Sequence, residues 1–225
     1  MSLDPFEENK LDITPDQLWN VQSIIQQAVM AVIMIASYFL VRYMIGTSPG
    51  QFSGLENWLE RLHALFATKS LPSDMFTGVL TGFALAVVLF FLDAGVGIIL
   101  RRNIKLWIHR SDYMLPVDKV QRKWALTTAL VGSPVEELMF RGFIFLGILP
   151  IWNTWIWSAM LLSAVFSLLH AVVQGFWSTL WIFIVSLLLC YFVTIDKSFY
   201  FIALVHAMLN VTNLFILPHI LKRKK

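Results

Sequence analysis

The sequence predicts an all-α protein that crosses a lipid bilayer several times as a bundle of helices. Of its 225 residues, 58% are hydrophobic and only 14% are charged, whereas about a quarter of the residues in a soluble globular domain carry a charge. The mean hydropathy is +0.71. Six apolar runs are each long enough to cross roughly 30 Å of hydrocarbon. No repeat or linker divides the chain, so we expect a single membrane-embedded domain over residues 1–225.

The segments follow one another in a simple order. A short acidic soluble tail over residues 1–20 comes first, and it lacks the basic and apolar regions of a cleavable signal peptide. The six expected transmembrane spans are 24–44, 75–100, 125–149, 154–173, 176–195 and 199–217. Only three residues join the last two spans, which predicts an antiparallel hairpin.

Two shorter segments are predicted to be interfacial helices. Over residues 55–66, apolar side chains recur every three or four positions, as in an amphipathic helix. We expect this helix on the outer surface of the membrane. The apolar run 105–108, which basic residues flank, is expected on the inner face.

The basic residues predict the orientation. Seven lysines and arginines lie in 101–124 and four in 222–225, whereas 46–74 holds only two. Because cytoplasmic loops carry the excess of basic residues, we expect both termini in the cytoplasm and the protein in the plasma (cytoplasmic) membrane. These basic residues are explained by the orientation of the protein in the membrane and by attraction to anionic lipid headgroups. Nucleic acid is therefore not indicated as a partner.

A few residues within the spans call for a packing explanation. Gly78 and Gly82 are spaced so that a neighbouring helix can approach closely. Asp93 is expected either to be paired structurally or to face a cavity. Cys190 is the single cysteine, which excludes a disulfide within the chain, and we expect it to fill space in the core.

Three ionisable residues interrupt the third expected span. Glu136, Glu137 and Arg141 would each cost about 2.5–3.5 kcal/mol at the centre of a bilayer if uncompensated. Glu137 and Arg141 are four residues apart, which favours an ion pair on one helix face. Glu136 diverges from Arg141 by about 140° around the helix. It is therefore predicted to face the bundle interior and to be available for proton transfer, unless all three residues form a packing network.

Further polar residues lie on two other spans. Phe166 and His170 share one face of the fourth span, and His206 and Asn210 share one face of the sixth. Polar side chains in the bilayer core must find partners within the protein. We therefore expect His170, His206 and Asn210 to share one cavity with Glu136, open toward the cytoplasmic half of the membrane.

These residues form three motifs: Glu-Glu-x-x-x-Arg at 136–141, Phe-x-x-x-His at 166–170 and His-x-x-x-Asn at 206–210. In this order the chain resembles the CPBP family of intramembrane proteases, which includes type II CAAX prenyl endopeptidases and bacteriocin-processing or immunity-associated Abi-like proteins. The resemblance implies catalytic core helices over 125–217 and hydrolysis of a peptide bond. It also implies a peptide or membrane-protein substrate, for which a prenylated carboxyl terminus is one option.

The resemblance also implies a role for each residue. Glu136, helped by His170, would take a proton from water, while His206 and Asn210 would donate hydrogen bonds to the oxyanion. Glu137, Arg141 and Phe166 would support them. No cofactor is favoured. The alternative is a zinc ion held by Glu136, His170 and His206, with a position open for water, although the sequence has no His-Glu-x-x-His motif.

Other functions use similar residues. Ser133 follows Gly132 but lacks the Gly-x-Ser-Gly context of a rhomboid-type serine protease. Buried carboxylates and histidines also build proton or cation pathways, but a transporter is expected to show repeated halves, and none is visible. A non-proteolytic scaffold or immunity-type binding protein of the same family is the remaining alternative.

Overall fold

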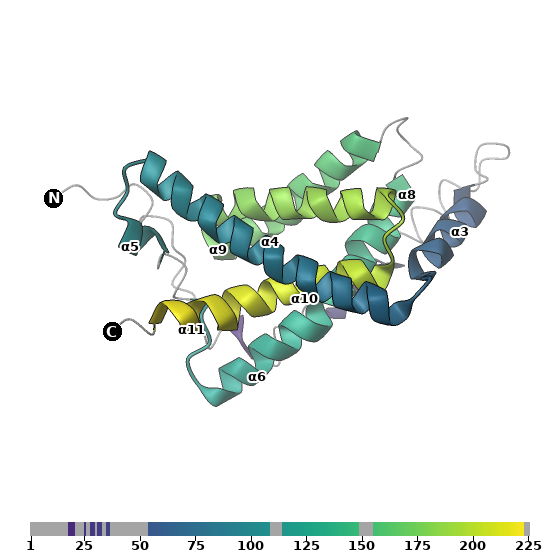
Figure 1. The fold of residues 1–225 in the computed structure, drawn as a ribbon. Helices are drawn as coiled ribbons and strands as arrows, with labels where there is room; N and C mark the ends of the chain where they lie inside the picture. Colours follow the sequence, from purple (N-terminus) through teal and green to yellow (C-terminus); the bar gives the residue numbers. More distant parts are fainter. Residues whose placement is uncertain are drawn as a thin grey trace.

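The computed structural model describes residues 18–20, 25, 28–29, 31–32, 35–36, 54–108, 114–148 and 155–222. These residues form helices and short connections, with no strand among them. The expected all-α architecture is therefore confirmed (Figure 1). Most of the acidic tail 1–20 and of the first expected span 24–44 lies outside the described residues.

The first long helix corresponds to the second expected span. The short helix α3 (Gly54–Phe66) leads into α4 (Leu71–Ile99). At the start of α4, the Ser70 hydroxyl accepts a hydrogen bond from the Ser73 amide, and a proline follows in the first turn, both of which favour a helix start. A second short helix, α5 (Ile104–Ile108), follows α4.

The third expected span forms an unbroken helical path that contains two π-helical segments. It consists of α6 (Lys119–Thr127), η2 (Thr128–Gly132), α7 (Ser133–Glu137), η3 (Leu138–Phe145) and α8 (Leu146–Ile148). The path begins after Asp118, whose carboxylate accepts a hydrogen bond from the Gln121 amide at 2.8 Å. Wide π turns are rare and occur frequently at functional sites. Both of them flank the segment that carries the two glutamates.

The helix α9 (Trp155–Thr194) folds back on itself. The rings of Trp155 and Tyr191 have centroids 5.9 Å apart, whereas a straight helix would separate these residues by about 54 Å. Figure 1 shows the two arms of this element. They correspond to the fourth and fifth expected spans, 154–173 and 176–195, which the sequence correctly separates.

The last part of the chain runs back along the second arm of α9. It comprises α10 (Phe199–Val211), η5 (Thr212–Ile216) and α11 (Leu217–Lys222). The connecting turn contains Asp196, which has a positive φ of 57°. Beyond the turn, the rings of Phe192 and Phe201 lie 5.2 Å apart. The expected antiparallel hairpin is therefore present (Figure 1).

Helices α4 and α10 are in backbone contact. A Cβ atom added to Gly78 would lie 2.8 Å from the Phe201 carbonyl oxygen, and one added to Gly82 would lie 2.4 Å from the Val205 carbonyl oxygen. Both distances are too short for a side chain, so the prediction that these glycines admit a neighbouring helix is correct. Because α10 also carries His206, this contact helps to position the site.

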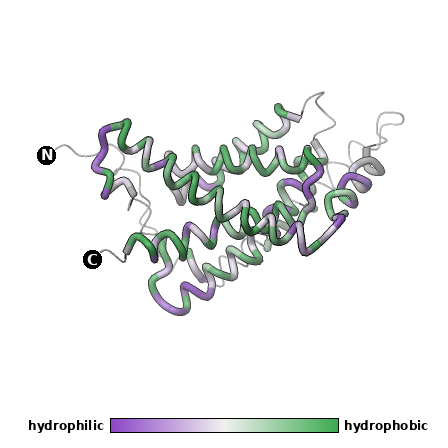
Figure 2. Tube along the Cα trace, viewed as in Figure 1, coloured by the Kyte–Doolittle hydropathy of each residue, from purple (hydrophilic) through white to green (hydrophobic). Residues whose placement is uncertain are grey.

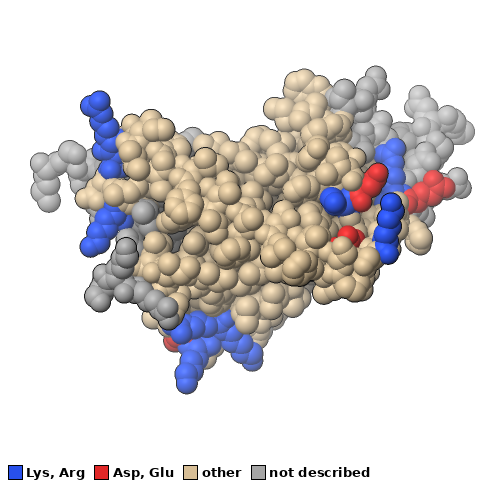
Figure 3. All heavy atoms as spheres, viewed as in Figure 1, with Lys and Arg blue, Asp and Glu red and all other residues tan. Residues whose placement is uncertain are grey.

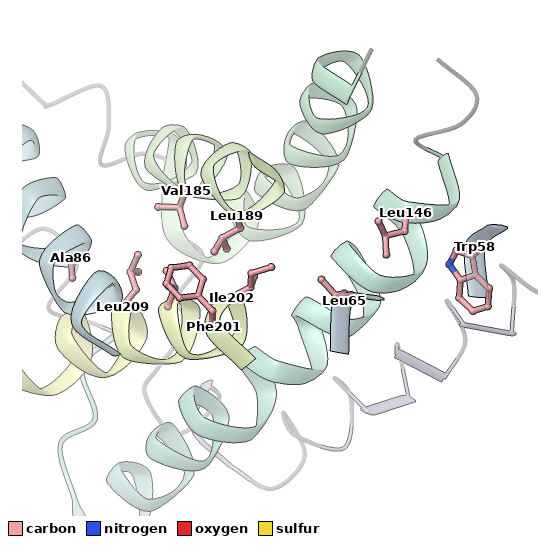
Figure 4. Packing of buried hydrophobic residues seen from close by; sticks show 10 residues of the cluster. Trp58, Leu65, Ala86, Leu146, Val185, Leu189, Phe201, Ile202 and Leu209 are labelled. Carbon is pink, nitrogen blue, oxygen red and sulfur yellow. The ribbon is translucent and has the colours of Figure 1, made fainter. Parts of the chain in front are cut away.

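The hydrophobic core lies between α10 and the elements around it. Figure 4 shows Val185 and Leu189 of α9 facing Phe201 and Ile202 of α10, with Ala86 of α4 nearby. Cys190 is fully buried and not in a disulfide, which agrees with the expected packing role. The core thus holds α10 against both α4 and the second arm of α9.

Among the described residues, three helical segments are long and apolar enough to cross a membrane: Leu71–Ile99, Trp177–Thr194 and Phe199–Leu221. The first arm of α9 is a shorter apolar helix, Trp155–Ala171. Figure 2 shows hydrophobic residues along the length of these helices, and Figure 3 shows Lys, Arg, Asp and Glu gathered toward the periphery of this view. This distribution is the one that a protein surrounded by lipid requires.

The two short helices pack against the bundle. Trp58 of α3 is only 2% exposed, and its indole donates a hydrogen bond to the Gly142 carbonyl at 3.1 Å. Trp107 of α5 is also buried, and its indole donates to the Asp93 carbonyl at 3.0 Å. The helix expected over 55–66 is confirmed as α3, and its tryptophan is buried against the rest of the protein.

Candidate functional site

Glu137 and Arg141 form a buried ion pair at the centre of the candidate site. The Arg141 guanidinium donates a hydrogen bond from Nη1 to Glu137 Oε1 at 3.0 Å. Neither side chain is more than 1% exposed. The pair between residues four apart is the one that the sequence predicts. Breaking such a buried pair leaves an uncompensated charge, which is strongly unfavourable.

Arg141 also connects the third span to both arms of α9. Its Nη2 atom donates to the Ser186 hydroxyl at 2.8 Å and to the Ser186 carbonyl at 3.3 Å. On the other side, the guanidinium carbon lies 4.9 Å from the centre of the Phe166 ring, within the range of a cation–π interaction. Phe166 is thus in contact with Arg141, and its supporting role stays a prediction.

His206 lies between the two glutamates. Its Nδ1 atom is 2.6 Å from Glu137 Oε1, and its Nε2 atom is 3.9 Å from Glu136 Oε2. An ionised carboxylate can only accept hydrogen bonds, so Nδ1 must carry the proton in the contact with Glu137. Glu137 thereby fixes the tautomer of the imidazole and turns Nε2 toward Glu136.

Glu136 differs from Glu137 in its surroundings. Its side chain is 19% exposed, against 0% for Glu137. Among the described residues it makes no hydrogen bond, because the distance to His206 exceeds that of a hydrogen bond. Glu136 therefore does not belong to the buried Glu137–Arg141 network and retains both oxygens as proton acceptors.

Asn210 is held by a residue that the sequence did not suggest for this role. Its Nδ2 atom donates a hydrogen bond to the Ser133 hydroxyl at 2.9 Å. Ser133 is the first residue of α7, four positions before Glu137, and is only 1% exposed. The pairs Ser133–Asn210 and Glu137–His206 thus form two successive contacts between antiparallel helices α7 and α10.

His170 reaches the site by way of Phe166. Its Nδ1 atom lies 2.8 Å from the Phe166 carbonyl oxygen, and the two rings have centroids 4.6 Å apart. The ring of Phe166 is in turn 6.2 Å from that of His206. Because a carbonyl only accepts hydrogen bonds, His170 Nδ1 is the donor. In a neutral ring, Nε2 then keeps a lone pair that can accept a proton.

A family comparison covers this whole arrangement. Residues 120–212 match the model of the Rce1-like type II CAAX prenyl endopeptidases. This segment is similar to the members of that family. No curated protein and no solved structure matches the chain. The match includes the helical path from the second residue of α6 to α8, both arms of α9 and all of α10.

The match to this family agrees with the resemblance that the three motifs indicated. The matched family is one of proteases, so the match supports a protease with a peptide substrate at the level of the family. Together with the apolar helices, the match indicates an integral membrane protein. All seven residues singled out in the sequence lie within the matched segment, which contains Glu136, Glu137, Arg141, Phe166, His170, His206 and Asn210.

The described residues of the matched segment include several potential metal ligands. No group of three or more His, Cys, Asp or Glu side chains lies close enough together to hold a metal ion in the part of the chain that the structure describes. Glu136 and His206 are close to each other, but His170 does not complete a three-ligand set with them. The zinc alternative stays a prediction that the structure does not test.

Three contacts in the site were not predicted. They are Glu137 with His206, Ser133 with Asn210, and Ser186 with Arg141. One signal for the first two was present in the sequence, because Ser133 and Glu137 have the same spacing of four as His206 and Asn210. On antiparallel helices, two such pairs can face each other. Ser186 gave no comparable signal, since serine is common in membrane helices.

Proposed function

We propose that this protein is an intramembrane endopeptidase in which Glu136 activates a water molecule. The contrast between neighbouring glutamates carries the proposal: Glu137 is fully buried and paired with Arg141 and His206, whereas Glu136 is partly exposed. A general base needs a free acceptor within reach of its substrate proton. The Rce1-like match supports peptide-bond hydrolysis as the reaction.

In the first step, Glu136 takes a proton from water while the water oxygen forms a bond to the scissile carbonyl carbon. The carbonyl π electrons move to oxygen and create an oxyanion. His170 assists through Nε2, because its Nδ1 is committed to the Phe166 carbonyl. General base catalysis of this type typically contributes a factor of about 10²–10⁴ to the rate.

His206 and Asn210 stabilise the oxyanion. Asn210 donates through Nδ2, one hydrogen of which is held by Ser133. His206 can donate only through Nε2, because Nδ1 donates to Glu137. This role requires a proton on both ring nitrogens of His206 at this step.

In the last step, the tetrahedral intermediate collapses and the bond from carbon to nitrogen breaks. The leaving nitrogen takes up the proton that Glu136 received from water, so the glutamate returns to its starting state. The products are a carboxyl group and an amine, and no redox change occurs. Glu137, Arg141 and Phe166 do not react; they hold His206 in place.

The substrate is a peptide segment or a membrane protein, and a prenylated carboxyl terminus is one substrate class that this chemistry would serve. In this proposal the chain forms one domain, its catalytic core spans 125–217, and the site opens toward the cytoplasmic half of the plasma membrane. Both termini are cytoplasmic. The reaction requires no cofactor.

Cleavage by the purified protein tests the proposal. Wild type, Glu136→Gln and His170→Ala would be incubated in lipid nanodiscs with prenylated C-a-a-X peptides and a library of membrane-protein fragments. Glu60→Gln is a matched control, because Glu60 is an exposed glutamate on α3. We expect Glu136→Gln to lose at least about 10²-fold in rate and Glu60→Gln to cleave normally. Normal cleavage by Glu136→Gln, or no cleavage of any substrate by wild type, would contradict the proposal.

A further inference from the structure

We infer that Ser133 is a positioning residue, which orients the side-chain amide of Asn210 toward the reacting carbonyl. This inference rests on the proposed function, because it assigns Ser133 to the oxyanion-stabilising side of the site. The starting observation is the hydrogen bond of 2.9 Å from Asn210 Nδ2 to Ser133 Oγ. Ser133 itself would not contact the substrate.

The placement of Ser133 repeats that of Glu137. Ser133 and Glu137 lie four residues apart on α7, and their partners Asn210 and His206 lie four residues apart on α10. Residues with this spacing share one face of a helix. Two side chains, Asn210 and His206, are proposed to contact the oxyanion. Each of them forms one hydrogen bond with the same face of α7.

The chemistry of an asparagine side chain explains why such a partner is needed. Its amide has a donor end and an acceptor end, and a half-turn about the terminal side-chain bond exchanges them. An oxyanion is stabilised by the donor end and repelled by the acceptor end. With one Nδ2 hydrogen bonded to Ser133, the amide keeps Nδ2 on the α7 side, and the second Nδ2 hydrogen stays available for the oxyanion.

Burial makes this hydrogen bond effective. Ser133 is 1% exposed, so water does not compete with its hydroxyl for the Asn210 amide. The backbone also fixes the position of Ser133, because its amide donates a hydrogen bond to the Thr128 carbonyl at the end of η2. A catalytic group held by a supported hydrogen bond loses little freedom when the transition state forms.

The test compares Ser133→Ala with a buried serine that lacks this contact. Ser158 is fully buried on the first arm of α9, and its hydroxyl has no hydrogen-bond partner among the described residues. Ser158→Ala is therefore the matched control. In nanodiscs with a farnesylated C-a-a-X peptide or the best library substrate, we expect Ser133→Ala to lower kcat by about 10- to 100-fold, somewhat less than loss of an oxyanion donor. KM should change by less than about twofold.

A double-mutant cycle separates positioning from a general effect on structure. If Ser133 acts through Asn210, Ser133→Ala should have no further effect on kcat once Asn210→Ala is present. The variant Ser133→Thr, which keeps the hydroxyl, should recover most of the activity. The thermal unfolding midpoint of every variant would be measured, so that loss of folded protein is not read as loss of rate.

The outcomes distinguish this inference from the proposed function. Suppose that wild type cleaves, that Glu136→Gln does not, and that Ser133→Ala cleaves at the normal rate. This result would overturn the role of Ser133 but leave the proposed function standing. Independent, multiplicative effects of Ser133→Ala and Asn210→Ala on kcat would also overturn it. A Glu136→Gln variant that cleaves at the normal rate would overturn the proposed function, and the role of Ser133 with it.

Discussion

The Nδ1 atom of His206 and the Nη1 atom of Arg141 donate to the same oxygen, Oε1 of Glu137, at 2.6 Å and 3.0 Å. Glu137 is thus shared between a structural arginine and a proposed catalytic histidine. This sharing gives the two adjacent glutamates different tasks, although the sequence presents them as a pair. In the proposed mechanism, Glu137 supports the fold and orients His206, while Glu136 exchanges a proton with water.

The first prediction is that mutation of Glu137 lowers the stability of the protein, whereas mutation of Glu136 lowers its cleavage activity. Glu137→Gln keeps the shape of the side chain but leaves the buried Arg141 guanidinium without its counter-charge. Removing one partner of a buried pair costs about 3–5 kcal/mol. Glu136→Gln should change the unfolding free energy by less than about 0.5 kcal/mol while it abolishes cleavage. Thermal or denaturant unfolding in detergent, with cleavage assays on the same samples, measures both quantities.

Equal destabilisation by Glu136→Gln and Glu137→Gln would contradict this separation. It would instead favour a packing network in which all three charged residues of the motif take part. Glu60→Gln serves again as the control, because that carboxylate is exposed on α3.

The second prediction concerns metal dependence. In the proposed mechanism Glu136 acts directly on water, so a strong zinc chelator should leave the cleavage rate unchanged. The zinc alternative uses Glu136, His170 and His206 as ligands and predicts loss of activity with the chelator and recovery with added zinc. The metal content of the purified protein, measured by mass spectrometry, provides a second readout. Activity that follows the zinc content would replace the metal-free mechanism with the zinc alternative.

The third prediction uses the close contact between α4 and α10. In Gly82→Ala the new methyl group would lie 2.4 Å from the Val205 carbonyl oxygen, so the helices must move apart. Overpacking of this kind costs about 1–3 kcal/mol. Since His206 follows Val205 directly, we also expect the cleavage rate to fall. Unfolding and cleavage would be measured on the same preparation.

Gly95→Ala is the control for Gly82→Ala. Gly95 lies on the same helix, and a Cβ atom added there would meet nothing within 4 Å. Alanine is favoured over glycine within a helix by about 1 kcal/mol, so this variant should be as stable as wild type or more stable. A Gly82→Ala protein that matched it in stability and activity would show that α10 can shift without affecting the site.

The sequence predicted features that depend on one helix at a time. Hydrophobic runs predicted where the long apolar helices α4, α9 and α10 lie, and the spacing of Glu137 and Arg141 predicted their ion pair, because both follow from the geometry of a single helix. The glycines at 78 and 82 predicted close packing, although not that α10 would be the partner.

Features that depend on register between helices were not predicted. The contact of His206 with Glu137 requires a particular antiparallel alignment of α7 and α10, which no pattern within either helix specifies. The same holds for Ser133 and Asn210. The π turns η2 and η3 were also missed, because a wide turn alters the hydrophobic period by only one residue and leaves the apolar run intact.

The last prediction concerns Asp93, for which the sequence allowed either a structural pair or a place in the cavity. Its carboxylate accepts a hydrogen bond from the Trp181 indole at 2.7 Å, and its carbonyl accepts one from Trp107 at 3.0 Å. Asp93 therefore joins α4 to α5 and to the second arm of α9. Asp93→Ala leaves the Trp181 donor without this acceptor, which should cost about 1–3 kcal/mol. Asp93→Asn retains an acceptor oxygen and should cost less.

Neither change should alter kcat for the fraction of protein that remains folded, because both tryptophans belong to a contact separate from the Glu137–His206 network. Asp196→Asn, in the exposed turn before α10, controls for the loss of a carboxylate, since asparagine tolerates the positive φ of that position. Unfolding midpoints and kcat would be compared for the three variants. If Asp93→Asn kept its stability but lost cleavage, Asp93 would belong to the catalytic cavity and its assignment as a structural residue would be wrong.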